Sequence, residues 1–163
     1  MGKSHFVLWA GFACALAAPA EAQLLERKDL SLGVALTIAG GAIDACKTKG
    51  FNISVVVVDR AGDTLVALRG DNASPHTMEN ARRKAYTARS TRRSTAEYAK
   101  QYTDGNHTVR QQTTLPHMIA IPGGLPIRVG EEVIGGGGVS GSPGGNDEPC
   151  LQAGIDKVKD VLK

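Results

Sequence analysis

Basic and phenolic side chains gather in one short stretch of the sequence. Arg82, Tyr86, Arg89 and Arg93 follow one another three or four positions apart, a spacing that places side chains along one side of a helix. Guanidinium groups beside an aromatic ring are suited to hold the carboxylates of a ligand. A solvated basic face of an ordinary amphipathic helix has the same pattern, so the sequence leaves a ligand site and a plain surface open.

Side chains that can bind a metal ion are spread along the chain. His107 lies in a polar loop, and His117 follows ten positions later, just beyond Pro116, which is not a recognised zinc spacing. We therefore predict His107 and His117 only as single iron ligands, with the phenols of Tyr86 and Tyr102 as alternatives. A lone histidine without a ligand pattern is more often a surface or capping residue.

A glycine tract near the C-terminus formally matches a dinucleotide-binding fingerprint, with Gly136, Gly138 and Gly141 in the required positions. That fingerprint should open a helix directly and lie in a βαβ unit, whereas the next predicted helix begins only at Asp147. We interpret the tract as a strand whose glycines admit a close neighbour. The small-residue helix, another subunit and a flat ligand all remain open as that neighbour.

Acid–base groups are present, but their spacing does not place them together. They are Asp59, Asp63, Glu79, Lys84 and Asp147. General acid–base catalysis needs such groups to converge in space, and no Ser-His-Asp order stands out. The residues therefore favour a binding protein over an enzyme.

Hydrophobic periodicity and turn residues predict nine elements. The first helix is capped by Asp29 or Ser31 and ends before Gly50. Strands follow at 53–58 and 64–69, then helices from Pro75 and Ser94, strands at 118–121, 126–129 and 133–139, and a helix at 147–162. This order predicts an α+β fold, with a five-stranded antiparallel sheet and the N- and C-terminal helices packed on one face.

The N-terminus predicts an exported protein. Lys3 precedes an apolar run at 6–18, and Ala20-Glu21-Ala22 has the small-x-small form of a cleavage site. The run is shorter than the roughly 20 residues that span a bilayer, so we interpret residues 1–22 as a signal peptide and 23–163 as a single domain. The expected mature chain begins at Gln23, has no transmembrane segment, and is periplasmic or secreted.

Composition limits the kinds of binding partner and the kinds of side chain that can fill the core. Among the 163 residues 42% are hydrophobic and only 4% aromatic, so small and β-branched side chains must fill the core. Lys and Arg exceed Asp and Glu by only 3 (19 against 16), which does not indicate nucleic-acid binding. Cys46 and Cys150 remain after export, and a disulfide between them or two buried thiols are both compatible with the sequence.

Five segments in a fixed order resemble the GlcG/HbpS family. They are the hairpin at 56–63, the motif Lys84-Ala85-x-Thr87-Ala88, the Gly-Gly-x-Pro segment at 123–126, the glycine-rich strand at 133–141, and a last helix with Asp147 and Cys150. The resemblance covers about residues 28–162. It implies a profilin-like sandwich that often forms homo-oligomers.

The resemblance also implies a class of ligand. Some members bind haem, and one exported member serves a membrane sensor kinase; a C-x-x-C-H motif for covalent attachment does not occur in this sequence. The iron partner in one member is a threonine, and Thr87 and Thr95 lie in the relevant stretch. The candidate ligand-binding residues are Arg82, Lys84, Tyr86, Thr87, Arg89 and Thr95.

Three hypotheses follow. The first is a homo-oligomer that binds haem or a related tetrapyrrole for sensing, storage or delivery, with a membrane sensor as a further partner. The second is an enzyme that degrades haem or acts on a small organic acid. The third is an oligomeric accessory subunit. The stretch from Arg89 to Arg93 is more basic than the family pattern, which indicates a ligand more anionic than haem as another outcome.

Overall fold

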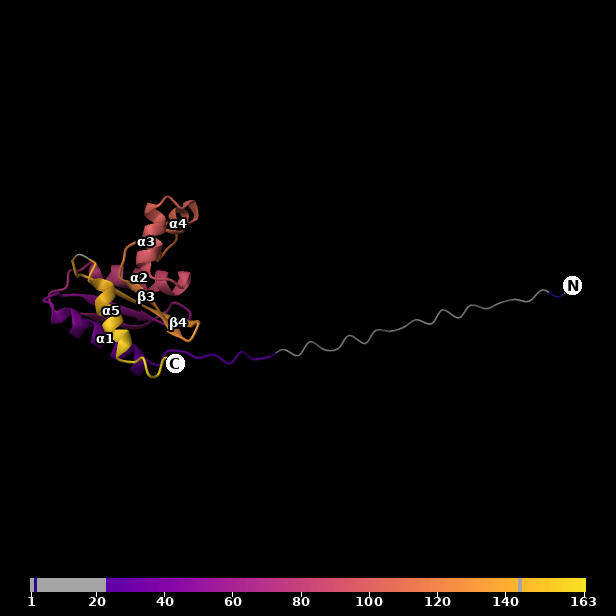
Figure 1. Ribbon diagram of the computed structural model, residues 1–163, viewed down its shortest axis with the longest axis horizontal. Coiled ribbons are helices and arrows are strands. Elements are labelled where there is room, and N and C mark those ends of the chain that lie inside the picture. The colour runs from indigo at the N-terminus through magenta and orange to yellow at the C-terminus, as the bar shows by residue number, and fades with distance from the viewer. Residues whose placement is uncertain (1, 3–22, 144) are drawn as a thin grey trace.

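The computed structural model describes residue 2, residues 23–143 and residues 145–163. The predicted signal peptide, apart from Gly2, lies outside the described residues. Within the described ranges, every helix is too short or too polar to cross a bilayer. Figure 1 shows a layered domain, with the described residues from 23 onward leading into its first helix.

Nine elements make up this domain. They are α1 (Leu32–Lys47), β1 (Ser54–Val58), β2 (Thr64–Arg69), α2 (Thr77–Thr91), α3 (Thr95–Thr103), α4 (His107–Gln112), β3 (Gly124–Val129), β4 (Glu132–Ser140) and α5 (Asp147–Asp156). The strands form one sheet in the order β2-β1-β4-β3, and every neighbouring pair is antiparallel. The predicted α+β class is confirmed, with four strands rather than five.

The segment predicted as a strand at 118–121 is not one. The backbone N–H of Ile119 donates to the Thr87 hydroxyl of α2 at 2.9 Å, and the N–H of Met118 donates to the carbonyl of Leu115. Because these donors are used locally and by a helix, the segment does not pair with the sheet. It lies along α2 instead.

Two local predictions, one at the end of α2 and one after α3, also need correction. Arg92 adopts a left-handed conformation with φ of 58°, which ends α2, so Arg93 is not on the same helix as Arg82. The loop predicted around His107 contains the short helix α4, whose N–H at Val109 is capped by the Asn106 side chain. With six polar-rich residues, α4 has no apolar periodicity to reveal it.

Helices cover both faces of the sheet, with α1 and α5 side by side on one face and α2 on the other (Figure 1). Every residue of β1 is buried. Val55 and Val57 join the larger core with α1 and α5, while Val56 and Val58 pack against Ala81 and Ala85 of α2. The prediction that the terminal helices share one face is confirmed.

The glycines of β4 let α2 approach the sheet closely. A Cβ atom placed on Gly138 would overlap the carbonyl oxygen of Ala81, and one on Gly136 would overlap that of Ala85. The small-residue helix is therefore the close neighbour of this strand. Helices α3 and α4 project away from the layers at one end of the domain (Figure 1).

Candidate functional site

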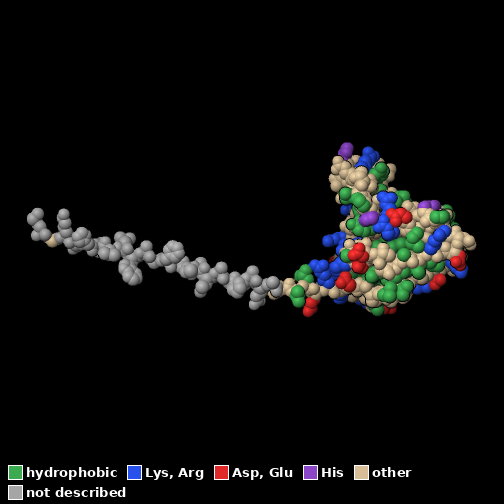
Figure 2. Space-filling view, turned by 180° about the vertical axis from the view of Figure 1, so that it is seen from behind, with side chains coloured by type: hydrophobic (Ala, Val, Ile, Leu, Met, Phe, Trp, Pro, Cys, Tyr) green, Lys and Arg blue, Asp and Glu red, His purple; other side chains and the backbone are tan. Residues whose placement is uncertain are grey.

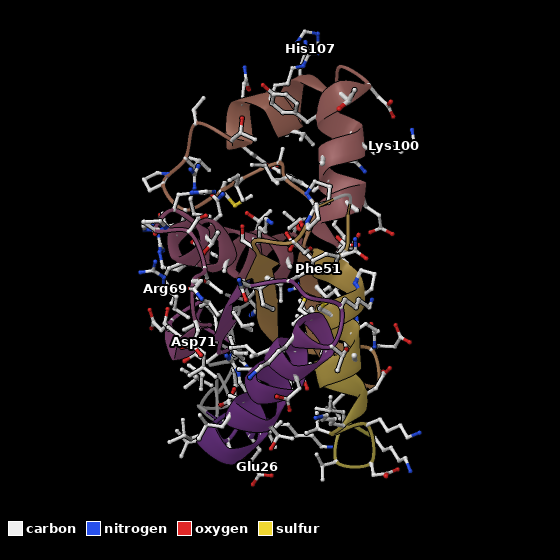
Figure 3. All side chains as sticks on the ribbon, turned by 90° about the vertical axis from the view of Figure 1, so that its left-hand side faces the viewer. Glu26, Phe51, Arg69, Asp71, Lys100 and His107 are labelled. Carbon is white, nitrogen blue, oxygen red and sulfur yellow. A yellow bond between two sulfur atoms is a disulfide. The ribbon has the colours of Figure 1, made fainter. Side chains whose placement is uncertain are left out.

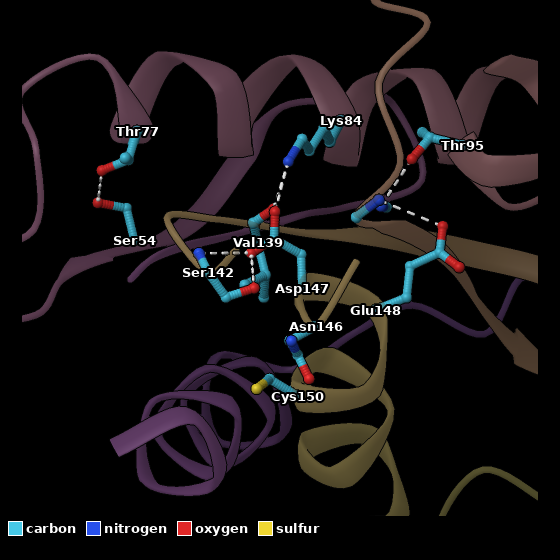
Figure 4. A network of polar contacts seen from close by, with 12 residues as sticks. Ser54, Thr77, Lys84, Thr95, Val139, Ser142, Asn146, Asp147, Glu148 and Cys150 are labelled. Carbon is cyan, nitrogen blue, oxygen red and sulfur yellow. Dashed lines mark hydrogen bonds and ion pairs between the residues drawn. The ribbon is translucent and has the colours of Figure 1, made fainter. Parts of the chain in front are cut away.

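The candidate ligand residue Lys84 lies in a buried ion pair rather than at a surface. Its side chain is only 2% exposed, and its Nζ donates to Asp147 Oδ2 at 2.7 Å and to the carbonyl of Val139 at 2.9 Å. Asp147 Oδ1 accepts from the backbone N–H and the hydroxyl of Ser142. Figure 4 shows this network between α2, the end of β4 and the start of α5. Lys84 therefore joins three elements of the fold.

The two candidate threonines are buried and engaged with backbone. Thr95 Oγ1 accepts from the N–H of Gly124 at 2.8 Å, as Figure 4 also shows, and Thr87 Oγ1 accepts from Ile119. Glu148, which the sequence did not single out, accepts from the N–H groups of Ala96 and Gly123. These contacts hold the start of α3 and the chain that leads into β3.

Arg82 is paired on the exposed side of α2. It donates to Glu79 at 2.7 and 2.9 Å and to His117 Nδ1 at 2.7 Å. The hydrogen bond from Arg82 lowers the pKa of Glu79. Because a guanidinium only donates hydrogen bonds, Nδ1 of His117 is the acceptor. That lone pair is thus occupied, and the ring meets Tyr86 edge-on at 5.5 Å.

The other candidate metal ligand, His107, is exposed at the start of α4. Figure 3 shows it at the far end of the α3–α4 pair, pointing away from the domain. Among the described residues, no three His, Cys, Asp or Glu side chains converge as they would around a metal ion. The structure thus does not bring His107 and His117 together.

Cys46 of α1 and Cys150 of α5 form a disulfide, with their Cα atoms 5.4 Å apart. Both residues are fully buried. Of the two states that the sequence left open, the structure has the bonded one. The disulfide lies on the opposite face of the sheet from α2, so it supports the scaffold rather than the candidate ligand surface.

A cavity of about 420 Å³ lies where α2, α3, α4 and the segment after α4 meet. Its apolar lining comprises Tyr98, Val109, Leu115, Pro116 and Met118. Its polar lining comprises Tyr86, Ser90, Thr91, Arg93 and Gln112. Ligand pockets have volumes of roughly 300–1,000 Å³ and combine apolar walls with a few polar groups. This cavity therefore has the size and chemistry of a small-molecule site.

Tyr98 forms the inner wall of this cavity. Tyr98 is 1% exposed, and its single O–H lies between two acceptors, the carbonyl of Val109 at 3.4 Å and Gln112 Oε1 at 3.3 Å. Burial raises the pKa of Tyr98, which favours the neutral phenol. On the rim, Arg93 donates to Gln101 Oε1 at 2.8 Å. Sequence reasoning placed Arg93 near the ligand but missed Tyr98, because its contacts come from a helix that was not predicted.

A separate groove of about 800 Å³ contains Arg89. It lies between the arm at 25–30, the turn at 59–61 and the end of α2. It shares no lining residue with the cavity around Tyr98. The basic side chains that the sequence grouped on one helix face are thus divided between Arg82 beside His117, Arg89 in the groove and Arg93 at the cavity.

Comparison with known proteins places the chain among relatives of one fold. The model of a family described as "Haem degrading protein HbpS-like" matches residues 30–156. Protein GlcG of Escherichia coli strain K12 is 29% identical over 111 residues, which cover 68% of this chain and 81% of GlcG.

Solved structures of related proteins have the same fold. The crystal structure of an HbpS double mutant from Streptomyces reticuli has a TM-score of 0.77 and 36% identity to this chain, and the match covers 87% of this chain and 97% of that one. The structure of a PduOC complex with haem has a TM-score of 0.72 and 24% identity, covering 78% and 93% of the two chains. At that identity the PduOC similarity shows the fold alone.

Proposed function

This chain belongs to the HbpS-like family, and from that premise we propose that it is an exported protein that binds haem in the cavity between α2, α3 and α4. The observation that carries the proposal is the lining of this cavity, which joins an apolar wall to the cation of Arg93. Haem is a largely apolar ring with carboxylates on one edge. The family description refers to haem, and PduOC was crystallised with haem, so the fold is compatible with that ligand.

The residues of the cavity fit the two parts of such a ligand. Val109, Leu115 and Met118 offer apolar contact to a ring, and burial of apolar surface supplies most of the affinity in sites of this kind. Arg93 lies at the rim, where its planar guanidinium suits a carboxylate. The site is open on one side, so the ligand would be only partly enclosed.

Candidate iron ligands lie within the same lining. Haem iron accepts His, Cys, Met or Tyr from proteins, and the lining contains Tyr86, Tyr98 and Met118. The single O–H of Tyr98 is already shared between two acceptors, and the sulfur of Met118 lies 3.9 Å from the Thr87 hydroxyl. Tyr86 makes no side-chain hydrogen bond to another described residue. We therefore favour Tyr86 as the iron ligand, with Met118 as the alternative.

The proposed role is to store, deliver or report haem outside the cytoplasm. The charged start, the short apolar run and the small-x-small site at 20–22 support export. Because a partly open site exposes one edge of the ligand, a second copy of the chain or a membrane sensor would complete the enclosure. The family description also names degradation, which the same titration tests.

The test is titration of haemin into the processed protein that begins at Gln23, followed by its visible absorption spectrum. We expect a saturable, shifted Soret band. Ser90 lies on the exposed rim of the cavity, so Ser90→Trp should fill the cavity without disturbing the core. Arg93→Gln should weaken binding by at least about tenfold, since a charge-assisted hydrogen bond contributes roughly 1.5–3 kcal/mol.

Arg110→Gln is the matched control, because Arg110 is an exposed arginine that contacts Tyr102 on α3 and does not line the cavity. Tyr86→Phe should change the spectrum of the bound ligand while leaving binding saturable. Equal affinity of the wild type, Ser90→Trp and Arg93→Gln would refute the site. Loss of the Soret band over time under air and a reductant would instead favour degradation.

A further inference from the structure

The groove beside the N-terminal arm has a charge arrangement that haem binding does not use. Figure 2 shows Lys and Arg side chains gathered with acidic ones where the arm meets the domain. The arginines that line the groove are Arg27, Arg60, Arg89 and Arg92, and the acids are Glu26, Asp29, Asp59 and Glu132. Although the groove has as many arginines as acidic residues, the acidic residues are not shared equally among the arginines.

Arg60 forms ion pairs with two of the four acids. Its Nε lies 3.0 Å from Asp29 Oδ1, its Nη1 lies 2.6 Å from Glu132 Oε1, and it also donates to the carbonyl of Lys28. Asp59 Oδ1 accepts from the backbone N–H of Asp63 at 2.9 Å. Three of the four acids therefore have ion-pair or hydrogen-bond partners other than Arg89 and Arg92.

Arg89 is left without an acceptor. Its Nε is buried and has no hydrogen-bond partner among the described residues, and no described carboxylate lies within ion-pair distance of it. Burial lowers the pKa of Arg89, and the charges of Arg60 and Arg92 lower it further, against a smaller opposing effect of Asp59. A buried donor without an acceptor is costly, and a guanidinium has five N–H donors to satisfy.

A structural role explains only part of this arrangement. Arg89 lies in the last turn of α2, where a cation offsets the negative end of the helix dipole. That role needs charge near the helix end, but it does not require the Nε to be buried without an acceptor. An anion in the groove would accept a hydrogen bond from the unpaired donor and would offset the repulsion among the arginines.

The backbone at Arg92 is held in place. Arg92 ends α2 in the left-handed conformation, and its carbonyl accepts from Arg128 Nη2 at 2.6 Å. Arg60, fixed by three acceptors, forms the opposite side of the groove. The positions from which the guanidinium groups reach into the groove are thus set by the fold before any ligand arrives, which reduces the cost of binding.

We propose that this groove is a second ligand site, in which Arg89 and Arg92 bind the oxyanion group of a small molecule, a carboxylate or a phosphate. Both groups match the planar fork of arginine and are bound bidentately by it. The site is separate from the cavity around Tyr98 and does not depend on haem. A small anion fits better than a macromolecule, because Glu26 and Asp29 of the arm line the same groove and would repel an extended anionic surface.

The test is the thermal stability of the processed protein during titration with inorganic phosphate and, separately, malonate. Sodium chloride keeps the ionic strength constant. Binding to the folded state raises the stability with the logarithm of the probe concentration once that concentration exceeds the dissociation constant. We expect this logarithmic rise with at least one probe, and the preferred probe identifies the ligand group. Arg89→Gln/Arg92→Gln should weaken the apparent affinity by at least about tenfold, while Arg110→Gln, which removes one exposed positive charge on α4, should leave it unchanged.

Two further measurements keep the proposal testable if the double variant does not fold. Arg89→Lys retains the charge but loses the fork, and it should weaken binding several-fold. In the wild type, the probe should shift the amide resonances of residues 59–61 and of Arg92. No stabilisation by either probe beyond that of sodium chloride at the same ionic strength, equal affinity in all variants, or shifts confined to other surfaces would overturn the proposal. Haemin binding should persist in the double variant, so the two sites can fail independently.

Discussion

Breaking the disulfide between Cys46 and Cys150 should remove a large part of the stability of this fold. The bond joins α1 to α5 across a separation of 104 residues. Both cysteines are fully buried in the core between these helices and the sheet. Because the bond closes a loop that contains most of the described domain, it restricts the unfolded chain more than a local bridge would.

The magnitude follows from the length of that loop. In the chain-entropy model, a loop of about 100 residues corresponds to about 4.7 kcal/mol at 25 °C. Measured losses for native disulfides are roughly 2–5 kcal/mol, so we expect the free energy of unfolding to fall by about 3–5 kcal/mol. With a urea m-value of about 2 kcal/mol/M, the midpoint of unfolding should move down by about 2 M.

The assay is urea unfolding of the oxidised protein, of the same protein under a thiol reductant, and of Cys46→Ala/Cys150→Ala. Reduction and substitution should lower the midpoint by similar amounts, and the reductant should have no effect on the double variant. A count of free thiols in the denatured protein establishes whether the bond is present. If the bond is present and its reduction moves the midpoint by less than about 0.3 M, the argument from loop closure is refuted.

Two predictions concern the contact between α2 and β4. Lys84→Met should cost about 3–5 kcal/mol, because Asp147 is left buried without its cation; urea unfolding measures this, and a loss below about 1 kcal/mol would contradict it. Gly138→Ala should destabilise by about 1–3 kcal/mol, since the new methyl group overlaps the Ala81 carbonyl. Gly40→Ala is its control, because a Cβ at Gly40 has nothing within 4 Å and should stabilise α1 by about 0.5–1 kcal/mol; equal effects of the two would count against the close approach.

The layers of the fold could be predicted because each has a period that the sequence displays. Apolar residues at helical spacing marked α1, and the run at 53–58 marked β1, whose burial on both faces matches its unbroken valines. The segment at 118–121 has the same apolar character, yet Thr87 takes the N–H of Ile119. A hydroxyl that competes for a backbone donor from another element leaves no periodic signal in the sequence.

The candidate site was harder to predict, because residues of similar type in one stretch of the sequence lie in different surroundings in the structure. Lys84, Thr87 and Thr95 lie in the conspicuous motif region, and all three are buried in contacts that hold the fold together. The cavity depends instead on Tyr98 and on residues near α4. A helix of six residues capped by Asn106 is too short to show periodicity, so the wall that it supplies could not be placed.

At Gly136 and Gly138 the face of β4 beneath α2 has no side chains. Side-chain packing at these two residues therefore does not fix the position of α2 along the strand. Four helical residues advance about 6.0 Å, and two residues of a strand advance about 6.6 Å. Ala81 and Ala85 therefore lie over Gly138 and Gly136 in nearly matching steps. Because Gly136 and Gly138 have no Cβ atoms, the strand itself presents no side chain there that would block a slip of α2 by one turn.

The ion pair of Lys84 resists that slip, because its two acceptors lie at one place only. A shift of one turn would move Nζ away from both Asp147 Oδ2 and the carbonyl of Val139 and leave a buried charge unpaired, which costs several kcal/mol. We therefore expect Lys84→Met to do more than lower stability. It should populate a second register of α2, seen as doubled amide resonances for Gly136 and Gly138. A single set of resonances in a folded Lys84→Met protein would mean that the pair stabilises the contact without selecting its register.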